Sequence, residues 1–191
     1  MAALRRKQGQ GCDLGHLEAL VARDSAGAYE ALQLFRSRAL RFKTKGDPKA
    51  AITTAAHGAR VLLKGSYLHA GSELSALAIS IIEESSTELD ADSRNIINEI
   101  DSAYESSEKD GSSSQQRMDF LKSCIKLTQT KGHRELGDPE LHVRLGMFYL
   151  SSPCFFPPRT TLLTCQFHLT KHAHTHNRPL PLGRRGGQAR D

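Results

Sequence analysis

The feature that most constrains the fold of this 191-residue chain is a helical pattern that occurs twice within residues 27–82. The run Gly27-Ala28-Tyr29-Glu30-Ala31 opens one amphipathic segment, and Gly65-Ser66-Tyr67-Leu68-His69-Ala70 opens another 38 residues later. Between them, Asp47-Pro48 opens a helix that returns the chain. Two helices in each period of about 20–50 residues are typical of α-solenoids. We therefore expect an all-α fold, an α-solenoid of TPR-like helical hairpins.

Six helices are predicted from apolar residues at helical spacing and from the residues at the turns. Gly46 suits the end of the first helix, Asp47 the N-cap of the second and Pro48 its first turn. The apolar–polar alternation of a strand is missing from the sequence. The predicted helices span approximately residues 28–45, 48–63, 67–82, 90–104, 115–130 and 139–148.

Three segments are expected along the chain: a flexible N-terminus over residues 1–15, the solenoid over 16–150 and a disordered tail over 151–191. Five of the seven prolines lie in the last segment, which mixes His, Arg, Gly and Pro without an apolar period. The apolar residues of the last predicted helix, Leu141, Leu145, Met147 and Phe148, should then be exposed for want of a covering repeat.

The cellular setting is predicted from what the sequence lacks. The four cysteines are far apart and form no C-x-x-C motif, as is usual for thiols in a reducing compartment. No apolar stretch approaches the ~20 residues needed to span a bilayer. The basic N-terminus is not followed by the apolar core of a signal peptide. We expect a cytosolic protein without a membrane span.

The charge of the chain is unevenly divided. Residues 1–64 hold 12 Lys and Arg against 5 Asp and Glu, whereas residues 65–110 hold 2 against 11. The segment 151–191 alone, with 6 basic residues and 1 acidic residue, accounts for the net charge of +5. The charge therefore does not favour a nucleic-acid partner. A basic third beside an acidic third suits charge-steered docking of a protein.

A set of glycines, helix starts and apolar positions recurs in a definite order and spacing over about 120 residues. Its members are Gly27-Ala28-Tyr29-Glu30-Ala31, Phe35-Arg36, Arg41-Phe42, Gly58-Ala59, Leu62-Leu63, Gly65, Gly71, Leu74, Leu77, Gly137-Asp138-Pro139-Glu140-Leu141-His142 and Leu145. In this order they resemble the Golgi-to-ER-traffic protein four family, whose members are cytosolic α-solenoids of the tail-anchored protein targeting pathway. The resemblance departs from the family after Phe148-Tyr149, where the family continues with further helical hairpins.

The resemblance implies a non-catalytic scaffold without a cofactor. Proteins of this family join the targeting ATPase to a ubiquitin-like partner and its co-chaperone complex. The N-terminal helices are expected to face the ATPase. The surface for the ubiquitin-like partner is expected to be missing here, because the tail after Leu150 departs from the family. Two alternatives remain: a generic helical-repeat adaptor of an unrelated complex, and a His-rich metal- or RNA-binding protein whose activity lies in the tail.

A basic face is the candidate partner-binding site. Arg38, Arg41 and Lys45 follow one another at i, i+3 and i+7, and therefore share one side of the first predicted helix. Arg36 and Lys49 lie nearby in the sequence and complete the predicted site. The alternative is an ordinary solvated face.

Other candidates favour structural interpretations. His168, His172, His174 and His176 in the tail could bind Zn²⁺ or Ni²⁺, but no surrounding residues fix them, so no metal site is predicted. The single Gly183-Arg184-Arg185-Gly186-Gly187 run is weak support for RNA binding. No P-loop, G-x-S-x-G or H-E-x-x-H motif is present, which argues against an enzyme. Tyr29 and Tyr67 are expected in the core, His142 as a packed residue, and Glu83, Glu84, Glu88, Asp90 and Asp92 as a solvated cluster.

Overall fold

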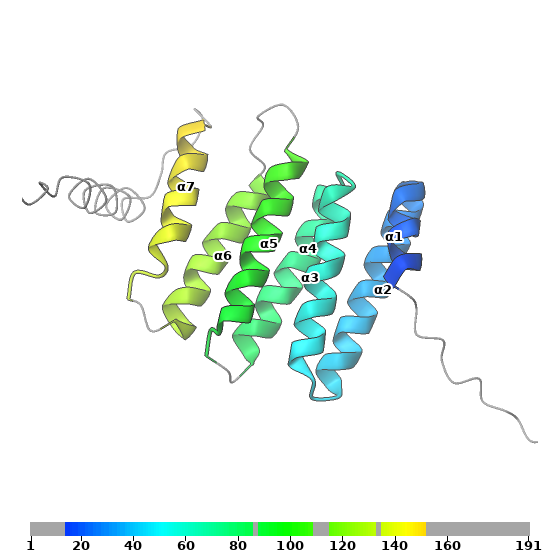
Figure 1. The fold of residues 1–191 in the computed structure, drawn as a ribbon, viewed down its shortest axis with the longest axis horizontal. Coiled ribbons are helices and arrows are strands. Elements are labelled where there is room, and N and C mark those ends of the chain that lie inside the picture. The colour runs from blue at the N-terminus through cyan, green and yellow to red at the C-terminus, as the bar shows by residue number, and fades with distance from the viewer. Residues whose placement is uncertain (1–13, 86–87, 109–114, 133–134, 152–191) are drawn as a thin grey trace, which may run out of the picture.

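The computed structural model describes residues 14–85, 88–108, 115–132 and 135–151, and within them the chain forms seven α-helices and no strand (Figure 1). The all-α prediction is therefore confirmed for the described part of the chain. The helices are α1 (Leu14–Arg23), α2 (Ser25–Thr44), α3 (Pro48–Lys64), α4 (Leu68–Glu84), α5 (Ala91–Ser107), α6 (Gln115–Lys131) and α7 (Pro139–Ser151).

The helices stack in two layers, as in a solenoid. Each helix packs against its neighbour in the chain, and the even-numbered helices α2, α4 and α6 also contact one another in order. The helices α1, α3 and α5 contact one another in the same way in the second layer. In Figure 1 the stack runs from α1 to α7 along the long axis of the molecule. Stacked hairpins bury their apolar faces against the next pair.

Helix α1 was not among the six helices predicted from the sequence. It begins at Leu14, inside the segment expected to be flexible, and buries Leu17, Leu20 and Val21. A one-residue break at Asp24 separates it from α2, and the Asp24 side chain accepts a 2.6 Å hydrogen bond from the Gly27 amide. A Cβ at Gly27 would lie 2.3 Å from the Leu20 carbonyl oxygen, so only glycine allows the two helices to meet this closely.

Two turns of the same type connect α2 to α3 and α3 to α4. After α2, the Gly46 amide bonds to the Lys43 carbonyl at 3.0 Å and the Asp47 amide to the Phe42 carbonyl at 3.0 Å. After α3, the Ser66 and Tyr67 amides make the corresponding bonds to Leu63 and Leu62. This Schellman pattern places one residue of each turn in the left-handed region, Gly46 at φ +78° and Ser66 at φ +66°.

The repeat proposed from the sequence is therefore out of register. Gly27 lies in the first turn of α2, whereas Gly65 is the C-cap of α3, so the two glycines do not occupy equivalent positions. The structure instead pairs Lys45-Gly46-Asp47 with Gly65-Ser66-Tyr67. The α-solenoid prediction is confirmed, but the equivalent positions of successive repeats are the two turns and not Gly27 and Gly65.

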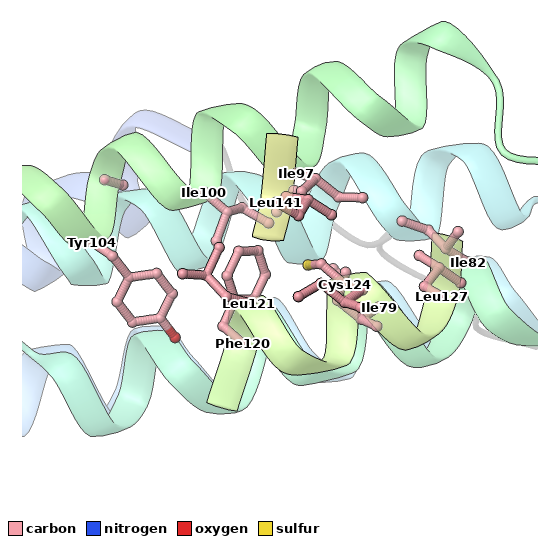
Figure 2. Close-up of a cluster of buried hydrophobic side chains, with 14 of the residues drawn as sticks. Ile79, Ile82, Ile97, Ile100, Tyr104, Phe120, Leu121, Cys124, Leu127 and Leu141 are labelled. Atoms are coloured by element: carbon pink, nitrogen blue, oxygen red, sulfur yellow. The ribbon is translucent and has the colours of Figure 1, made fainter. Parts of the chain in front are cut away.

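The core consists of two neighbouring clusters of apolar side chains. The first consists of residues from α1, α2, α3 and α4 and includes Phe35 and Leu62, both fully buried. The second extends from α2 and α3 to α7 and includes Tyr104, Leu121 and Cys124 (Figure 2). Small buried residues on α3 let its neighbours come close.

The predictions for Tyr29 and for most of the apolar face of α7 were wrong. Tyr29 lies on the surface of α2 and is 64% exposed, whereas Tyr67 is half-buried against the first cluster. Leu141, Leu145 and Phe148, expected to be exposed, are buried because they belong to the second cluster with α6. Of that set only Met147 is exposed, at 66%, beside Leu150 at 85%.

The predicted tail over residues 151–191, with its histidine run and arginine–glycine run, lies outside the described residues apart from Ser151, the last residue of α7. Within the described ranges, no helix is both long enough and apolar enough to cross a membrane.

Candidate partner-binding surface

The predicted basic residues gather where α2 ends and α3 begins. Arg38, Arg41 and Lys45 lie on one side of the C-terminal half of α2, and Lys49 lies in the first turn of α3. We name these four residues the basic end of the α2–α3 hairpin. In Figure 1 this hairpin turn lies at the lower edge of the stack.

The Schellman turn holds this surface in place. Lys45 is the C-cap of α2, and its amide bonds to the carbonyls of Arg41 and Phe42, each at 3.1 Å. Asp47 caps α3 by accepting a 3.0 Å hydrogen bond from the Ala50 amide. Because both helix ends are capped, the backbone that carries the four cations is well defined.

One of the cations is packed against an aromatic ring. The guanidinium of Arg38 lies 5.8 Å from the ring centroid of half-buried Phe42, a cation–π geometry. Together with Lys49 and Asp47, these two residues line a shallow depression between α2 and α3. The basic end therefore combines positive charge with a partly exposed aromatic surface.

Arg36, the fifth predicted residue, is not part of this surface. It lies on the other side of α2, where its guanidinium is 3.8 Å from the carboxylate of Glu73 on α4. Lys43 points the same way, and its ammonium is 2.5 Å from Glu84 of α4. The hydrogen bond from Lys43, together with one from Ser80, lowers the pKa of Glu84.

The second layer carries matching ion pairs. Lys49 donates a 2.7 Å hydrogen bond to Asp92 of α5, which raises the pKa of the lysine. Farther along α3, Arg60 pairs with Glu99 of α5. Basic residues of the first third of the sequence thus form ion pairs with acidic residues of the second third, between helices of consecutive repeats. The cluster expected to be solvated is partly engaged in the same way, since Glu84 and Asp92 are paired and Asp90 caps α5.

Arg41 and Lys45 are the members of the basic end that have no ion-pair partner within the described ranges. Both side chains are exposed, and they lie one turn apart on α2. Their charge is therefore available to an acidic partner, whereas Arg36 and Lys49 would have to exchange an internal contact for an external one.

A buried polar junction, not predicted from the sequence, holds the C-terminal helices together. Asp101 of α5 is 3% exposed and accepts hydrogen bonds from Arg117 of α6 at 2.9 Å and from Arg144 of α7 at 3.2 Å. Arg117 also donates to Glu108 at 3.0 Å. Burial lowers the pKa of the Arg117 guanidinium, but the two carboxylates outweigh this effect and raise it. The residues are far apart in sequence, so no local pattern indicated the junction.

The remaining candidates for chemistry are structural in the described part of the chain. His142 is 4% exposed, and its Nε2 lies 2.7 Å from the Leu136 carbonyl, so the prediction of a packed, hydrogen-bonded residue is confirmed. Cys124 is fully buried, and burial raises the pKa of its thiol. No group of three or more His, Cys, Asp or Glu side chains could hold a metal ion within those ranges.

Comparisons with known proteins agree with this architecture. Residues 45–174 match the family described as Golgi to ER traffic protein 4, a match that begins at the end of α2 and extends beyond Leu150. No curated protein matches the chain. The crystal structure of C. therm. Get4 is similar to this chain with a TM-score of 0.64 and 25% sequence identity, over 73% of this chain and 43% of that one. This chain thus spans less than half the length of that Get4.

The family match covers more than half of the 191 residues, and the helical stack agrees with that of a solved Get4. The glycines, caps and apolar positions that carried the resemblance lie at turns and in the core of this stack. The chain belongs to the Golgi to ER traffic protein 4 family.

Proposed function

We propose that this chain is a non-catalytic adaptor in the post-translational targeting of tail-anchored membrane proteins to the endoplasmic reticulum, and that it acts in the cytosol. Family membership supports this role, and the stack of helical hairpins is an architecture suited to holding other proteins. In this role the chain holds its partners together and catalyses no reaction itself.

The basic end of the α2–α3 hairpin is the proposed contact for the targeting ATPase. One observation carries this assignment: Arg41 and Lys45 are exposed, adjacent and not used in ion pairs between the described repeats. An acidic surface on the ATPase would be attracted to them over a Debye length of about 8 Å at physiological salt. Such charges act mainly on the rate of association.

The experiment compares two charge-reversed variants in binding to purified targeting ATPase, with and without nucleotide. Arg41→Glu/Lys45→Glu should lower the association rate constant by about tenfold at low salt and weaken its dependence on salt. The matched control is Lys122→Glu/Lys126→Glu, which reverses two exposed lysines on α6 at the same spacing. Equal rates for the two variants would remove the basic end from the proposal. No ATPase binding by the unaltered chain would favour a generic adaptor of another complex.

A further inference from the structure

A pocket between α4 and α6 has no role in the fold or in the proposed ATPase contact. It has a volume of about 200 Å³ and opens between the N-terminal halves of these two helices, with Tyr104 from α5 at its base. A water molecule occupies about 30 Å³ of liquid, so the pocket could hold several waters or one long side chain. It lies at the opposite end of the helices from the basic end of the α2–α3 hairpin.

The base of the pocket contains a buried hydroxyl without a well-formed hydrogen bond. Tyr104 is fully buried, and its hydroxyl oxygen has no hydrogen-bond partner of normal geometry in the described structure. Figure 2 shows its ring beside Phe120, with the oxygen directed away from α5. Ser75 lies close enough to interact with this hydroxyl, but it donates its own proton to the Gly71 carbonyl at 2.8 Å. A buried hydroxyl without a well-formed hydrogen bond is costly.

The other hydroxyls at the pocket offer acceptors for the same reason. Ser72 donates its proton to the His69 carbonyl at 2.8 Å, and Ser123 donates to the Asp119 carbonyl at 2.9 Å. Each serine hydroxyl has one proton and two lone pairs. Since the protons are used within the helices, the serine oxygens at the pocket can only accept. An occupant with several donors would satisfy them.

The negative charge at the pocket favours a cationic ligand. Asp119 lines its rim, and its carboxylate is exposed. The Gln115 amide and the Lys122 ammonium both approach Oδ1 of this carboxylate, at 2.9 and 4.0 Å, and within the described residues Oδ2 accepts no hydrogen bond. The wall of the pocket is apolar and consists of Ala76, Ile79 and Phe120. An aliphatic stem with a cationic tip therefore matches both the wall and the rim.

We propose that the α4–α6 pocket binds a lysine side chain presented by a partner protein. The stem of the lysine packs against Ile79 and Phe120, and its ammonium donates to Asp119 and to the serine oxygens that line the pocket. An ammonium has three donors and no acceptor, in agreement with an acceptor-rich pocket. Burial is the main cause that raises the pKa of Tyr104 to about 12, and the Asp119 charge contributes to the rise. Both effects disfavour a second negative charge in the pocket.

The test is a titration of the full ¹⁵N-labelled chain with Nα-acetyl-lysine methylamide, followed by the amide resonances of residues that line the pocket. Nα-acetyl-norleucine methylamide, which keeps the stem and lacks the amine, is the matched probe. We expect saturable shifts at Ser75, Phe120 and Ser123 with the lysine probe, and at least tenfold weaker binding of norleucine. Asp119→Asn should weaken lysine binding severalfold, whereas Glu105→Gln, an exposed carboxylate on α5 outside the pocket, should not.

Three outcomes would overturn the proposal. Equal affinity for both probes would show an apolar groove without charge selection. An absence of saturable shifts would show that the pocket holds solvent only. Unchanged lysine binding by Asp119→Asn would remove the ion pair on which selection depends. Because the pocket lies apart from the basic end, each of these results leaves the proposed ATPase contact untouched.

Discussion

The ammonium of Lys49 in α3 lies 2.7 Å from Oδ2 of Asp92 in α5, 43 residues farther along the chain. The same relation joins Arg36 to Glu73 between α2 and α4. Each pair connects helices of one layer in consecutive repeats. Both ions of the Lys49–Asp92 pair are exposed, so the pair adds little stability but penalises a stack in which one hairpin has slipped against the next.

Reversing one charge of this pair should weaken the fold only slightly. Lys49→Glu places two carboxylates together and should lower the free energy of unfolding slightly, and adding Asp92→Lys should restore most of the loss. Urea unfolding of the two single variants and the double variant measures the coupling. The coupling should shrink at high salt, since screening acts on exposed charges. A coupling near zero at low salt would mean that the pair does not set the register.

Local sequence patterns predicted most of the helices, but they could not indicate contacts between residues that are far apart in the sequence. Asp47 and Pro48 marked the start of α3 correctly because capping depends on the nearest backbone amides. Helix α1 had a usable signal, Leu17, Leu20 and Val21 on one face, but no helix was predicted before residue 28. The ion pairs between consecutive repeats could not be predicted without the fold, since their partners are about 40 residues apart in sequence.

The sequence placed only part of the candidate partner-binding surface, because helical spacing is a local pattern and contacts between helices are not. Arg38, Arg41 and Lys45 could be placed together because helical spacing fixes their shared face. Arg36, grouped with them from the sequence, lies on another side of α2: two positions from Arg38 correspond to about 200° around a helix, which turns it toward α4. The acceptor-lined pocket at Tyr104 combines three helices, so no sequence pattern indicated it.

Removing the carboxylate of Asp101 should be among the most damaging single changes. Asp101→Ala would leave the guanidiniums of Arg117 and Arg144 without their shared acceptor, and Arg117 is well buried. Loss of one partner of a buried pair costs about 3–5 kcal/mol, and the partial exposure of Arg144 reduces this to about 2–4 kcal/mol. Chemical unfolding measures the loss. The exposed Asp119→Asn variant should stay within about 0.5 kcal/mol of the parent. Equal stability of the two variants would show that Asp101 is not the junction of α5, α6 and α7.

Adding one methyl group at Gly58 should destabilise the first core cluster. A Cβ there would lie 2.6 Å from Cγ of Phe35 and 2.7 Å from Cδ1 of Leu74, so α2 or α4 must move away from α3. Overpacking of this kind costs about 1–3 kcal/mol, against a small gain in helix propensity. Thermal unfolding of Gly58→Ala tests this. Leu74→Ala makes room for the methyl group, so the double variant should lose less stability than the two single changes together.

The buried hydroxyl of Tyr104 should make stability depend on pH in alkaline solution. Burial raises its pKa in the folded state from 10.0 to about 12. Between these values the unfolded chain releases the proton and the folded chain keeps it, so stability falls as pH rises from about 10 to 12. Two pKa units correspond to about 2–3 kcal/mol. The difference in unfolding free energy between the parent and Tyr104→Phe, measured at pH 9 and pH 11.5, isolates this contribution from that of the lysines. A difference independent of pH would contradict it.

Ser66 is the site where a single substitution should strengthen the chain. It occupies the left-handed position of the turn between α3 and α4 at φ +66°, and its amide still bonds to the Leu63 carbonyl at 2.9 Å. A side chain at such a position costs about 1 kcal/mol, which glycine avoids. Ser66→Gly should therefore raise the free energy of unfolding by up to about 1 kcal/mol, less the entropy that glycine gains in the unfolded chain.

Gly46→Ser makes the reverse change in the equivalent turn and should lower the free energy of unfolding by a similar amount. Because nothing lies within 4 Å of a Cβ at Gly46, a loss there reports backbone strain alone. Opposite signs for the two variants in the same unfolding assay would establish that the two turns are equivalent points of the repeat.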